Sequence, residues 1–346
     1  MRYDLAKGGV FLTEPIVVLG AGSWGTAIAR LLAQKGFEVW LWVRRRELAE
    51  KLQNTRENSE YLPGVFLPEN VNVFTCFSDL PVSKPLIVIA VPSFAVREIV
   101  KRFLEEASQI VEPMAFVNLA KGLEKDSLKT MSEVIREVTC SKRVFTLTGP
   151  SHAEEVGRDF PTAVVLAGED LEMGQRLQNV FLTERFRVYL SDDLKGVEYA
   201  ATVKNIIAIA AGISDGLGYG DNSKGALIAR GLAEMVRMAA VIGARKETIF
   251  GLAGLGDLVA TCTSRHSRNR LVGERIGKGE KLEEILSSMK MVAEGVFAAK
   301  TMHQLAQNHG IEMPITAAVY EILYENASPL HKLDELMNRQ PKMETL

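Results

Sequence analysis

The stretch from Ile16 to Ala33 reads IVVLGAGSWGTAIARLLA and decides the fold of the first half of the chain. Its first four residues are apolar and mostly β-branched, which is typical of a short strand buried on both faces. Gly20, Gly22 and Gly25 then fit the pattern G-x-G-x-x-G, and helical periodicity continues to Lys35. Gly20 permits a tight turn, Gly22 lets the backbone approach a pyrophosphate, and Gly25 lets the helix pack on the strand. The stretch therefore predicts a dinucleotide-binding βαβ unit.

A glycine-rich turn can also occur without a ligand, so the surroundings of this motif matter. Here the turn follows a strand and precedes a helix, and a second apolar run at Val39–Val43 completes the required context. Further apolar runs predict strands at Val71–Thr75, Leu86–Val91, Ala115–Leu119, Val144–Thr148, Thr162–Ala167 and Phe186–Leu190. The first half is thus predicted to be an α/β Rossmann dinucleotide-binding domain spanning residues 15–192, after an N-terminal lead-in of residues 1–14.

Strand signals nearly vanish after Leu194, where Ala, Leu, Met and Gly become frequent. The pattern predicts helices at Leu194–Ala211, Ser223–Val241, Arg268–Ile276, Leu282–Met289, Ala293–His309 and Thr316–Tyr324. We therefore expect an all-helical substrate-binding domain over residues 193–346, which packs over the cofactor cleft of the α/β domain.

The composition excludes several other classes of protein. The chain of 346 residues is 47% hydrophobic and 24% charged, as expected of a globular protein with a large core. A net charge of −2 gives no general attraction to nucleic acid or to a membrane surface. Three scattered cysteines without a C-x-x-C motif indicate neither disulfides nor a metal site, and they favour the cytoplasm. The longest apolar stretch, Ile206–Ile213, is too short to span a bilayer, and the first residues lack the apolar core of a signal peptide.

The residues after the second predicted strand bear on the choice of coenzyme. An NAD site is expected to carry an acidic residue about 20 residues beyond the glycines, where it binds the ribose hydroxyls. This chain instead has Arg44, Arg45 and Arg46. Two of these cations are able to hold the 2′-phosphate of NADP, whereas the alternative is an ordinary solvated basic loop. The sequence predicts that NADP serves at least as well as NAD.

Two segments of the first half carry candidate polar groups at the carboxyl ends of strands. Lys121 follows the strand that ends at Leu119, so its ammonium is placed to contact a substrate oxygen or phosphate, although a surface lysine is the alternative. The turn Gly149–Ala153 follows the next strand and offers backbone N–H groups near the nicotinamide. His152 in this turn is a candidate general base, but a lone histidine after a turn is more often structural.

Lys204 is the outstanding residue of the second half because it interrupts a nearly all-apolar helix. Burial of an ammonium depresses its pKa toward the range useful for proton transfer. The alternative is a lysine that extends to solvent, but the polar Asn205 beside it favours a site. Asp257, in the glycine-dense segment Gly251–Leu258 that we expect to be a loop, is able to orient this ammonium or else to cap a helix.

A second polar group follows at Ser267, Arg268 and Asn269. Ser267 as a helix N-cap places the backbone donors of the next two residues at a helix N-terminus, which binds anions. A planar guanidinium holds a phosphate with two hydrogen bonds. The cluster predicts a phosphate site, and a charged helix surface is the alternative.

With these residues in hand, the chain resembles the NAD(P)-dependent glycerol-3-phosphate dehydrogenases of the bacterial type from about Ile16 to Tyr324. The resemblance depends on eight ordered blocks: GAGSWGTA, AKGL at 120–123, GPSHA at 149–153, VKN at 203–205, ALIARGLAEM at 226–235, GLAGLGDL at 251–258, SRNR at 267–270 and VAEG at 292–295. Seven blocks beyond the glycine motif are far more specific than the glycines alone.

The resemblance implies interconversion of dihydroxyacetone phosphate and sn-glycerol 3-phosphate, with Lys204 as the proton acceptor. Lys121, Asp257 and Asn205 complete the predicted catalytic group. The residues implied around the substrate are Lys121, Gly149, Ser151, Lys204, Asp257, Ser267, Arg268 and Asn269. Those implied around the nucleotide, besides Gly20, Gly22 and Gly25, are Ser23, Trp24, Arg44, Arg45, Lys121, Ala153, Arg268, Val292 and Glu294. His152 departs from the family, which more often has Phe at this position.

Two other functions remain open on the sequence alone. A related 3-hydroxyacid or sugar-acid dehydrogenase shares the two-domain plan but needs a carboxylate site in place of the phosphate site. A dinucleotide-binding sensor without chemistry is the other, although the presence of Lys204 and Asp257 argues against it. We expect a small-molecule substrate, no metal, no nucleic acid, no membrane insertion and a cytoplasmic enzyme that supplies phospholipid synthesis, with a homodimer as the candidate assembly.

Overall fold

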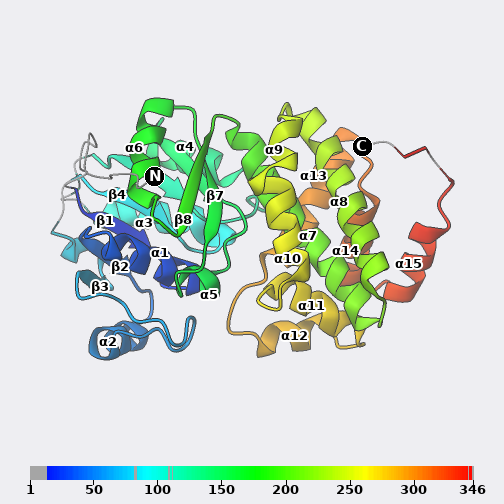
Figure 1. The fold of residues 1–346 in the computed structure, drawn as a ribbon, viewed down its shortest axis with the longest axis horizontal. Coiled ribbons are helices and arrows are strands. Elements are labelled where there is room, and N and C mark those ends of the chain that lie inside the picture. Colours follow the sequence, from blue (N-terminus) through cyan, green and yellow to red (C-terminus); the bar gives the residue numbers. More distant parts are fainter. Residues whose placement is uncertain (1–13, 82–83, 108–109, 111, 342, 345–346) are drawn as a thin grey trace.

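The computed structural model describes residues 14–81, 84–107, 110, 112–341 and 343–344, so most of the predicted lead-in lies outside the described residues. A β-sheet with helices on its faces forms the first half, and helices alone form the second (Figure 1). The strands are β1 (Ile16–Leu19), β2 (Val39–Trp42), β3 (Val71–Phe74), β4 (Leu86–Ile89), β5 (Ala115–Asn118), β6 (Val144–Thr148), β7 (Thr162–Ala167) and β8 (Phe186–Ser191). All eight predicted strands are therefore confirmed.

The strands form one sheet in the order β3-β2-β1-β4-β5-β6-β7-β8. Strands β1 to β6 run parallel to one another, and the strand order reverses between β1 and β4. In such sheets a ligand binds at this reversal, beyond the carboxyl ends of the strands. The sequence did not predict that β7 pairs antiparallel with β6, so that β7 and β8 run against the rest. A connection that holds only a one-turn helix allows this reversal, whereas a parallel pair needs a longer crossover.

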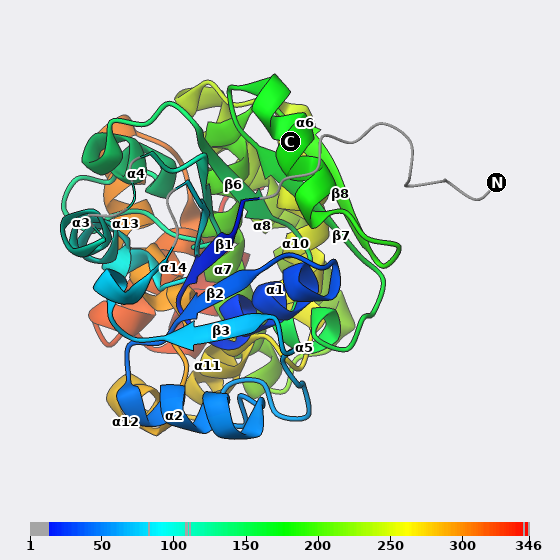
Figure 2. The ribbon, with the colours of Figure 1, turned by 90° about the vertical axis from the view of Figure 1, so that its left-hand side faces the viewer.

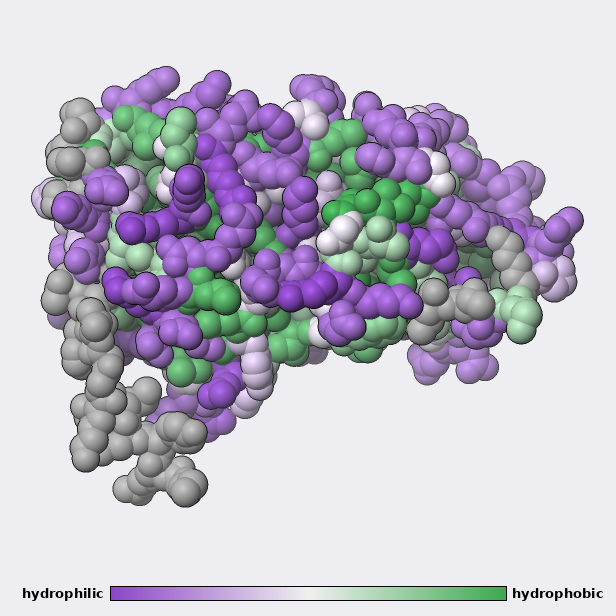
Figure 3. Space-filling model, turned by 90° about the horizontal axis from the view of Figure 1, so that it is seen from above, coloured by the Kyte–Doolittle hydropathy of each residue, from purple (hydrophilic) through white to green (hydrophobic). Residues whose placement is uncertain are grey.

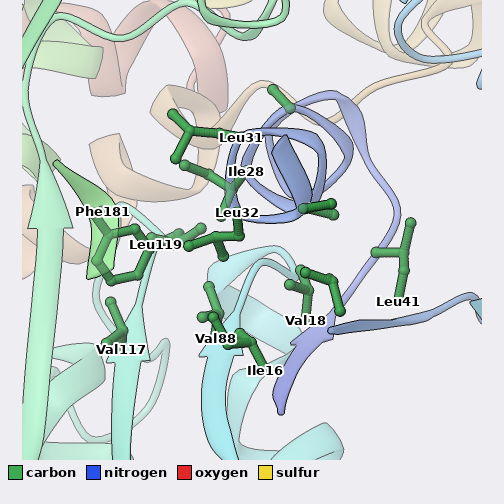
Figure 4. Close-up of a cluster of buried hydrophobic side chains, with 14 of the residues drawn as sticks. Ile16, Val18, Ile28, Leu31, Leu32, Leu41, Val88, Val117, Leu119 and Phe181 are labelled. Carbon is green, nitrogen blue, oxygen red and sulfur yellow. The ribbon is translucent and has the colours of Figure 1, made fainter. Parts of the chain in front are cut away.

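The central strand β1 is fully buried on both faces, as its apolar run predicts. Ile16 and Val18 belong to one hydrophobic core and Val17 and Leu19 to another, on the opposite face of the sheet. In Figure 4, Ile16 and Val18 lie on the side of the sheet that faces Ile28, Leu31 and Leu32 of the first helix. The alternation places β1 rigidly in the middle of the sheet and fixes where its following glycine turn begins.

Helices and short 3-10 turns lie against the sheet in the described part of this half (Figure 2). They are α1 (Ser23–Gln34), α2 (Arg46–Thr55), η1 (Phe77–Asp79), η2 (Ser93–Ala95), α3 (Val96–Glu106), α4 (Met131–Thr139), α5 (Ala153–Val156) and α6 (Leu171–Phe181). The apolar sides of α1 and α6 join one core and those of α3 and α4 join the other. This three-layer arrangement is the predicted Rossmann architecture.

The helical half is built around one long helix, α7 (Leu194–Gly216), which packs against α8, α10, α11, α13 and α14. The elements of this half are α8 (Asp221–Ile242), α9 (Lys246–Phe250), η3 (Leu252–Gly256), α10 (Asp257–Thr263), α11 (Arg268–Gly277), α12 (Leu282–Ser288), α13 (Glu294–His309), α14 (Pro314–Tyr324) and α15 (Pro329–Met337). Glycines bring α7 and α11 into backbone contact: a Cβ at Gly212 would lie 2.0 Å from the carbonyl oxygen of Arg270. That contact fixes the N-terminus of α11 relative to α7.

Helix α7 is long and apolar enough to cross a membrane, yet 89% of its apolar window is buried inside the protein. It is thus the core helix of this half, surrounded by other helices. Hydrophilic residues cover most of the face of the molecule that Figure 3 shows.

The prediction of a loop at Gly251–Leu258 is wrong. A π-helical turn, η3, occupies residues 252–256 and leads directly into α10. The glycines here serve close packing, because a Cβ at Gly254 would lie 2.0 Å from the carbonyl oxygen of Ile249. Helices α9 and α15 were not predicted either. The strand β8 ends at Ser191 and α7 begins at Leu194, and the domain boundary at 192/193 stays a prediction.

Candidate functional site

A cavity of about 400 Å³ lies at the carboxyl ends of the strands and is closed on its other side by helices of the second half. It opens where the strand order reverses between β1 and β4. Its walls include most of the residues that the sequence predicts for the site, namely Gly20, Gly22, Ser23, Trp24, Arg44, Arg45, Lys121, Ser151, Ala153, Lys204, Asn205, Asp257, Ser267, Arg268, Asn269, Val292 and Glu294. Of the predicted residues, Gly25 and Gly149 do not line this cavity.

The glycine turn has the geometry that a dinucleotide pyrophosphate requires. Gly20 has a φ of +118°, and a Cβ there would lie 2.7 Å from the carbonyl oxygen of Ala90. A Cβ at Gly25 would lie 1.9 Å from the carbonyl oxygen of Gly20, so only glycine lets α1 begin this close to β1. At Gly22 nothing lies within 4 Å of the Cβ position, which leaves the N-terminus of α1 open to the cavity. The residues present therefore fit the phosphates of NAD or NADP.

Lys204 extends from α7 into a polar cluster at the cavity wall and is only 4% exposed. Its Nζ lies 3.1 Å from Oδ1 of Asp257 and donates to Oγ1 of Thr261 at 2.7 Å. The other carboxylate oxygen of Asp257 accepts a hydrogen bond of 2.7 Å from Nζ of Lys121. One buried carboxylate thus holds two ammonium groups, one from each half of the protein. The alternative of a solvent-exposed Lys204 is wrong.

Burial sets the charge balance of this cluster. It lowers the pKa of Lys204 to about 8, against the attraction of Asp257 and with some help from the positive charge of Lys121. Burial also works to raise the pKa of Asp257, but Lys121 and Lys204 together hold it below its ordinary value. Asp257 is therefore ionised near neutral pH, while Lys204 exchanges its proton close to the working range of an enzyme.

The turn after β6 fixes the position of Lys121 through a backbone carbonyl. The carbonyl oxygen of Gly149 accepts hydrogen bonds from Nζ of Lys121 at 3.3 Å and from Oγ of Ser151 at 2.9 Å. His152 lines the cavity, and its Nε2 lies 3.4 Å from the carbonyl oxygen of Ala260. Burial, aided by Lys204, lowers the pKa of His152, so the imidazole is neutral near pH 7. His152 contacts backbone and gives no geometric sign of being the general base.

The predicted phosphate cluster lies at the N-terminus of α11. Ser267 caps this helix through a hydrogen bond from the N–H of Arg270 to its Oγ, 3.2 Å long. Arg268 is half-buried in the cavity wall, and no ion pair or side-chain hydrogen bond of its guanidinium occurs among the described residues. Burial lowers the pKa of Arg268, opposed by the charges of Glu294 and Glu154. An unpaired, desolvated guanidinium at a helix N-terminus suits an anionic ligand.

Two amides join the helices beneath this cluster. Nδ2 of Asn269 donates to Oδ1 of Asn205 at 2.9 Å, and Oδ1 of Asn269 accepts from the N–H of Gly295 at 2.9 Å. Nδ2 of Asn205 donates to the carbonyl oxygen of Ala201 at 3.2 Å. These bonds fix α7, α11 and α13 relative to one another, so contact of either amide with a substrate stays a prediction.

Glu294 connects the two halves beside the cavity. Its Oε1 accepts from the N–H of Ser93 at 2.9 Å and its Oε2 from Oγ of Ser93 at 2.5 Å. Burial raises the pKa of Glu294, although Ser93 and Arg268 oppose this change. A larger residue at position 122 would clash with Ser93, since a Cβ on Gly122 would lie 2.6 Å from Oγ of Ser93. The bonds to Ser93 bring Glu294 to the end of β4, where the cofactor is expected.

Three polar residues that contact the site were not among the predicted site residues. Thr261 contacts Lys204 and lies one helical turn beyond Asp257, a spacing that becomes visible only when residues 257–263 are read as a helix. Ser93 and Glu60 pair with Glu294 and Arg45 through long-range contacts that no local pattern indicates. Within the described ranges, no group of three or more His, Cys, Asp or Glu side chains is arranged to hold a metal ion.

Comparison with known proteins agrees with this geometry. Two family models, described as the N-terminus and the C-terminus of NAD-dependent glycerol-3-phosphate dehydrogenase, match residues 15–174 and 193–334. The chain belongs to this family. A relative from Chlorobium limicola named glycerol-3-phosphate dehydrogenase (NAD(P)+) is 51% identical over 332 residues, which are 95% of this chain and 99% of the relative. One of the same name from Pelotomaculum thermopropionicum is 47% identical over 95% of this chain and 94% of its own length.

Among solved structures, glycerol-3-phosphate dehydrogenase from Coxiella burnetii is similar over 94% of this chain and 99% of its own, with a TM-score of 0.89 and 41% identity. Family membership confirms the predicted fold class, a Rossmann domain followed by a helical domain, and the resemblance seen in the sequence. It also confirms that the protein is an enzyme, an NAD(P)-dependent oxidoreductase of the glycerol-3-phosphate dehydrogenase family.

Proposed function

We propose that the protein interconverts dihydroxyacetone phosphate and sn-glycerol 3-phosphate, with Lys204 as the general acid and base. The observation that carries this proposal is the position of the Lys204 ammonium. It is buried and bonded to Asp257 and Thr261, and it lies in the wall of the cavity that also contains the glycine turn and Arg268. The names of relatives such as the Chlorobium limicola enzyme support the same reaction.

The side chains of the cavity have separate parts in the reaction. When NADPH or NADH is bound, its nicotinamide supplies the hydride for the carbonyl carbon of the ketone. Lys204 gives a proton to the carbonyl oxygen on reduction and takes it from the hydroxyl on oxidation. Lys121 and Asn205 polarise that oxygen as negative charge develops, and Asp257 keeps both ammonium groups in place. Arg268 and the N-terminus of α11 orient the substrate through its phosphate.

A spectrophotometric assay tests the proposed reaction directly. Oxidation of NADPH and NADH is followed with dihydroxyacetone phosphate, and 3-hydroxyacids are offered with the oxidised coenzymes as the rival substrates. We expect turnover with dihydroxyacetone phosphate, with NADPH at least as effective as NADH because Arg44 and Arg45 line the cavity. Turnover of hydroxyacids alone favours the rival dehydrogenase, and no turnover with any of them favours a sensor.

Replacement of Arg268 by alanine tests the phosphate site. Because charge-assisted hydrogen bonds contribute about 1.5–3 kcal/mol, KM for dihydroxyacetone phosphate should rise roughly 10- to 100-fold, with a smaller effect on kcat. Steady-state kinetics of this variant are compared with those of Arg265→Ala, which removes an exposed arginine of the preceding turn. An unchanged KM in Arg268→Ala places the phosphate elsewhere.

The pKa of Lys204 predicts opposite pH profiles for the two directions. Oxidation of glycerol 3-phosphate needs the neutral amine, so kcat/KM should rise with pH and level off above about 8. Reduction needs the ammonium, so its kcat/KM should fall above about 8. Both profiles are measured between about pH 6 and pH 10. Profiles without a break in this range exclude Lys204 as the titrating group.

The same proposal extends to the location and assembly of the enzyme. A net charge of −2 agrees with an enzyme that binds neither nucleic acid nor a membrane surface. A cytoplasmic location and a role in supplying phospholipid synthesis are proposed from the reaction itself. The predicted homodimer stays a prediction, which sedimentation analysis tests.

A further inference from the structure

An acidic residue lies against the basic end of the cavity. Arg45 follows β2 and lines the cavity, and its Nη2 donates to Oε1 of Glu60 at 2.6 Å. The same nitrogen lies 3.3 Å from the hydroxyl of Tyr61, and the guanidinium lies 5.8 Å from the centroid of the Tyr61 ring. Glu60 is half-buried and comes from the segment after α2, so the contact depends on the fold around it.

Three cations, Arg44, Arg45 and Lys290, line this end of the cavity, and Glu60 forms an ion pair with Arg45. Arg44 and Lys290 line the same cavity, and neither has an ion pair among the residues that the structure describes. The hydrogen bond from Arg45 holds the pKa of Glu60 below its ordinary value, and Lys290 contributes to the same effect. Glu60 therefore carries a full negative charge at neutral pH, next to an arginine expected to bind the coenzyme.

We propose that Glu60 sets the coenzyme preference by offsetting the charge of Arg45, so that NADH remains usable beside NADPH. NADPH differs from NADH by a 2′-phosphate, and arginines after the second strand accommodate this group. Arg44 and Lys290 attract it with no carboxylate paired to them among the described residues, whereas the attraction of Arg45 is reduced by its ion pair with Glu60, which also repels the phosphate. The uncharged 2′-hydroxyl of NADH experiences no such repulsion. This inference deepens the proposed function and depends on its coenzymes alone.

Glu60→Gln tests the proposal because it removes the charge while an amide oxygen still accepts from Arg45. Dissociation constants of NADPH and NADH are measured by fluorescence of the reduced nicotinamide, with no substrate present. We expect the constant for NADPH to fall roughly fivefold, which corresponds to the contribution of one partly exposed ion pair, and that for NADH to change less than about twofold. Glu60→Lys should shift the NADPH constant further in the same direction.

Salt dependence and a matched control make the test specific. The gain in NADPH binding should shrink between 0.05 M and 1 M salt, since the Debye length falls from above 10 Å to about 3 Å. Glu50→Gln removes a carboxylate that pairs with Arg46 on the exposed side of α2 and should leave both constants unchanged.

Equal changes for NADPH and NADH, or no change in either Glu60 variant, overturn the proposal. Failure of the proposed function is recognised separately, by the wild-type protein failing to oxidise NADPH with dihydroxyacetone phosphate. If the wild type fails this assay but the Glu60 variants still change the ratio of the NADPH and NADH dissociation constants, the role of Glu60 is supported and only the proposed substrate is contradicted.

Discussion

Replacement of Lys204 by alanine should lower kcat for dihydroxyacetone phosphate roughly 10²- to 10⁴-fold, the usual contribution of general acid–base catalysis. Binding of NADPH should persist, because the glycine turn and the arginines after β2 do not contact Lys204. The fold should also persist, since Asp257 keeps its ion pair with Lys121 at 2.7 Å. Rapid-mixing kinetics under single-turnover conditions measure the loss in the chemical step itself.

Two further experiments separate loss of the proton donor from general damage. Small primary amines added to Lys204→Ala should restore part of the rate, because they replace the missing ammonium in the space that it leaves. Lys195→Ala removes an exposed lysine at the start of the same helix and should turn over like the wild type. Turnover of Lys204→Ala at the wild-type rate contradicts the mechanism.

Replacement of Asp257 by asparagine should lower the free energy of unfolding by about 3–5 kcal/mol, because it leaves buried positive charge without its counterion. Asp257 is only 3% exposed and contacts both Lys121 and Lys204. Its loss should also depress the pKa of Lys204 further, which moves the break in both pH profiles below pH 8. Urea denaturation gives the stability, and the pH profiles give the second effect.

Asp215→Asn is a matched control for this prediction. Asp215 also bridges two cations, Lys224 and Arg270, but its side chain is 16% exposed. Water screens such a pair, so this loss should be nearer 1 kcal/mol. Equal losses in the two variants contradict a special role for burial at Asp257.

Most of the sheet is predictable because each buried strand is a short apolar run with turn residues on either side. The sequence does not show that β7 pairs antiparallel with β6, since an apolar run has no direction. The segment from Gly251 was expected to be a loop because glycine is a poor helix former. It is helical because its glycines permit contacts that a Cβ prevents, as at Gly254. Tertiary packing therefore outweighs local propensity at that point.

The centre of the site is predictable for a different reason. A lysine within an apolar helix needs a partner, and Asp257 is the only acid of the glycine-dense segment 251–258, so Lys204 and Asp257 stand out as a pair. Contacts between residues that are far apart in the sequence cannot be predicted in this way. Ser93 and Glu294 are 201 positions apart, and only the packing of α13 against the end of β4 brings them together. Glu60 reaches Arg45 only because the chain folds back after α2.

The proposed mechanism requires that the Lys204 amine titrate far below a free lysine because it is buried. The most direct measurement is an NMR titration of lysine side chains labelled with 13C at Cε, with the Lys204→Arg spectrum used for assignment. We expect a resonance that titrates with a pKa of about 8 and is absent in that variant. A Lys204 resonance that titrates near the ordinary value of 10.5 rules out the proposed role of burial.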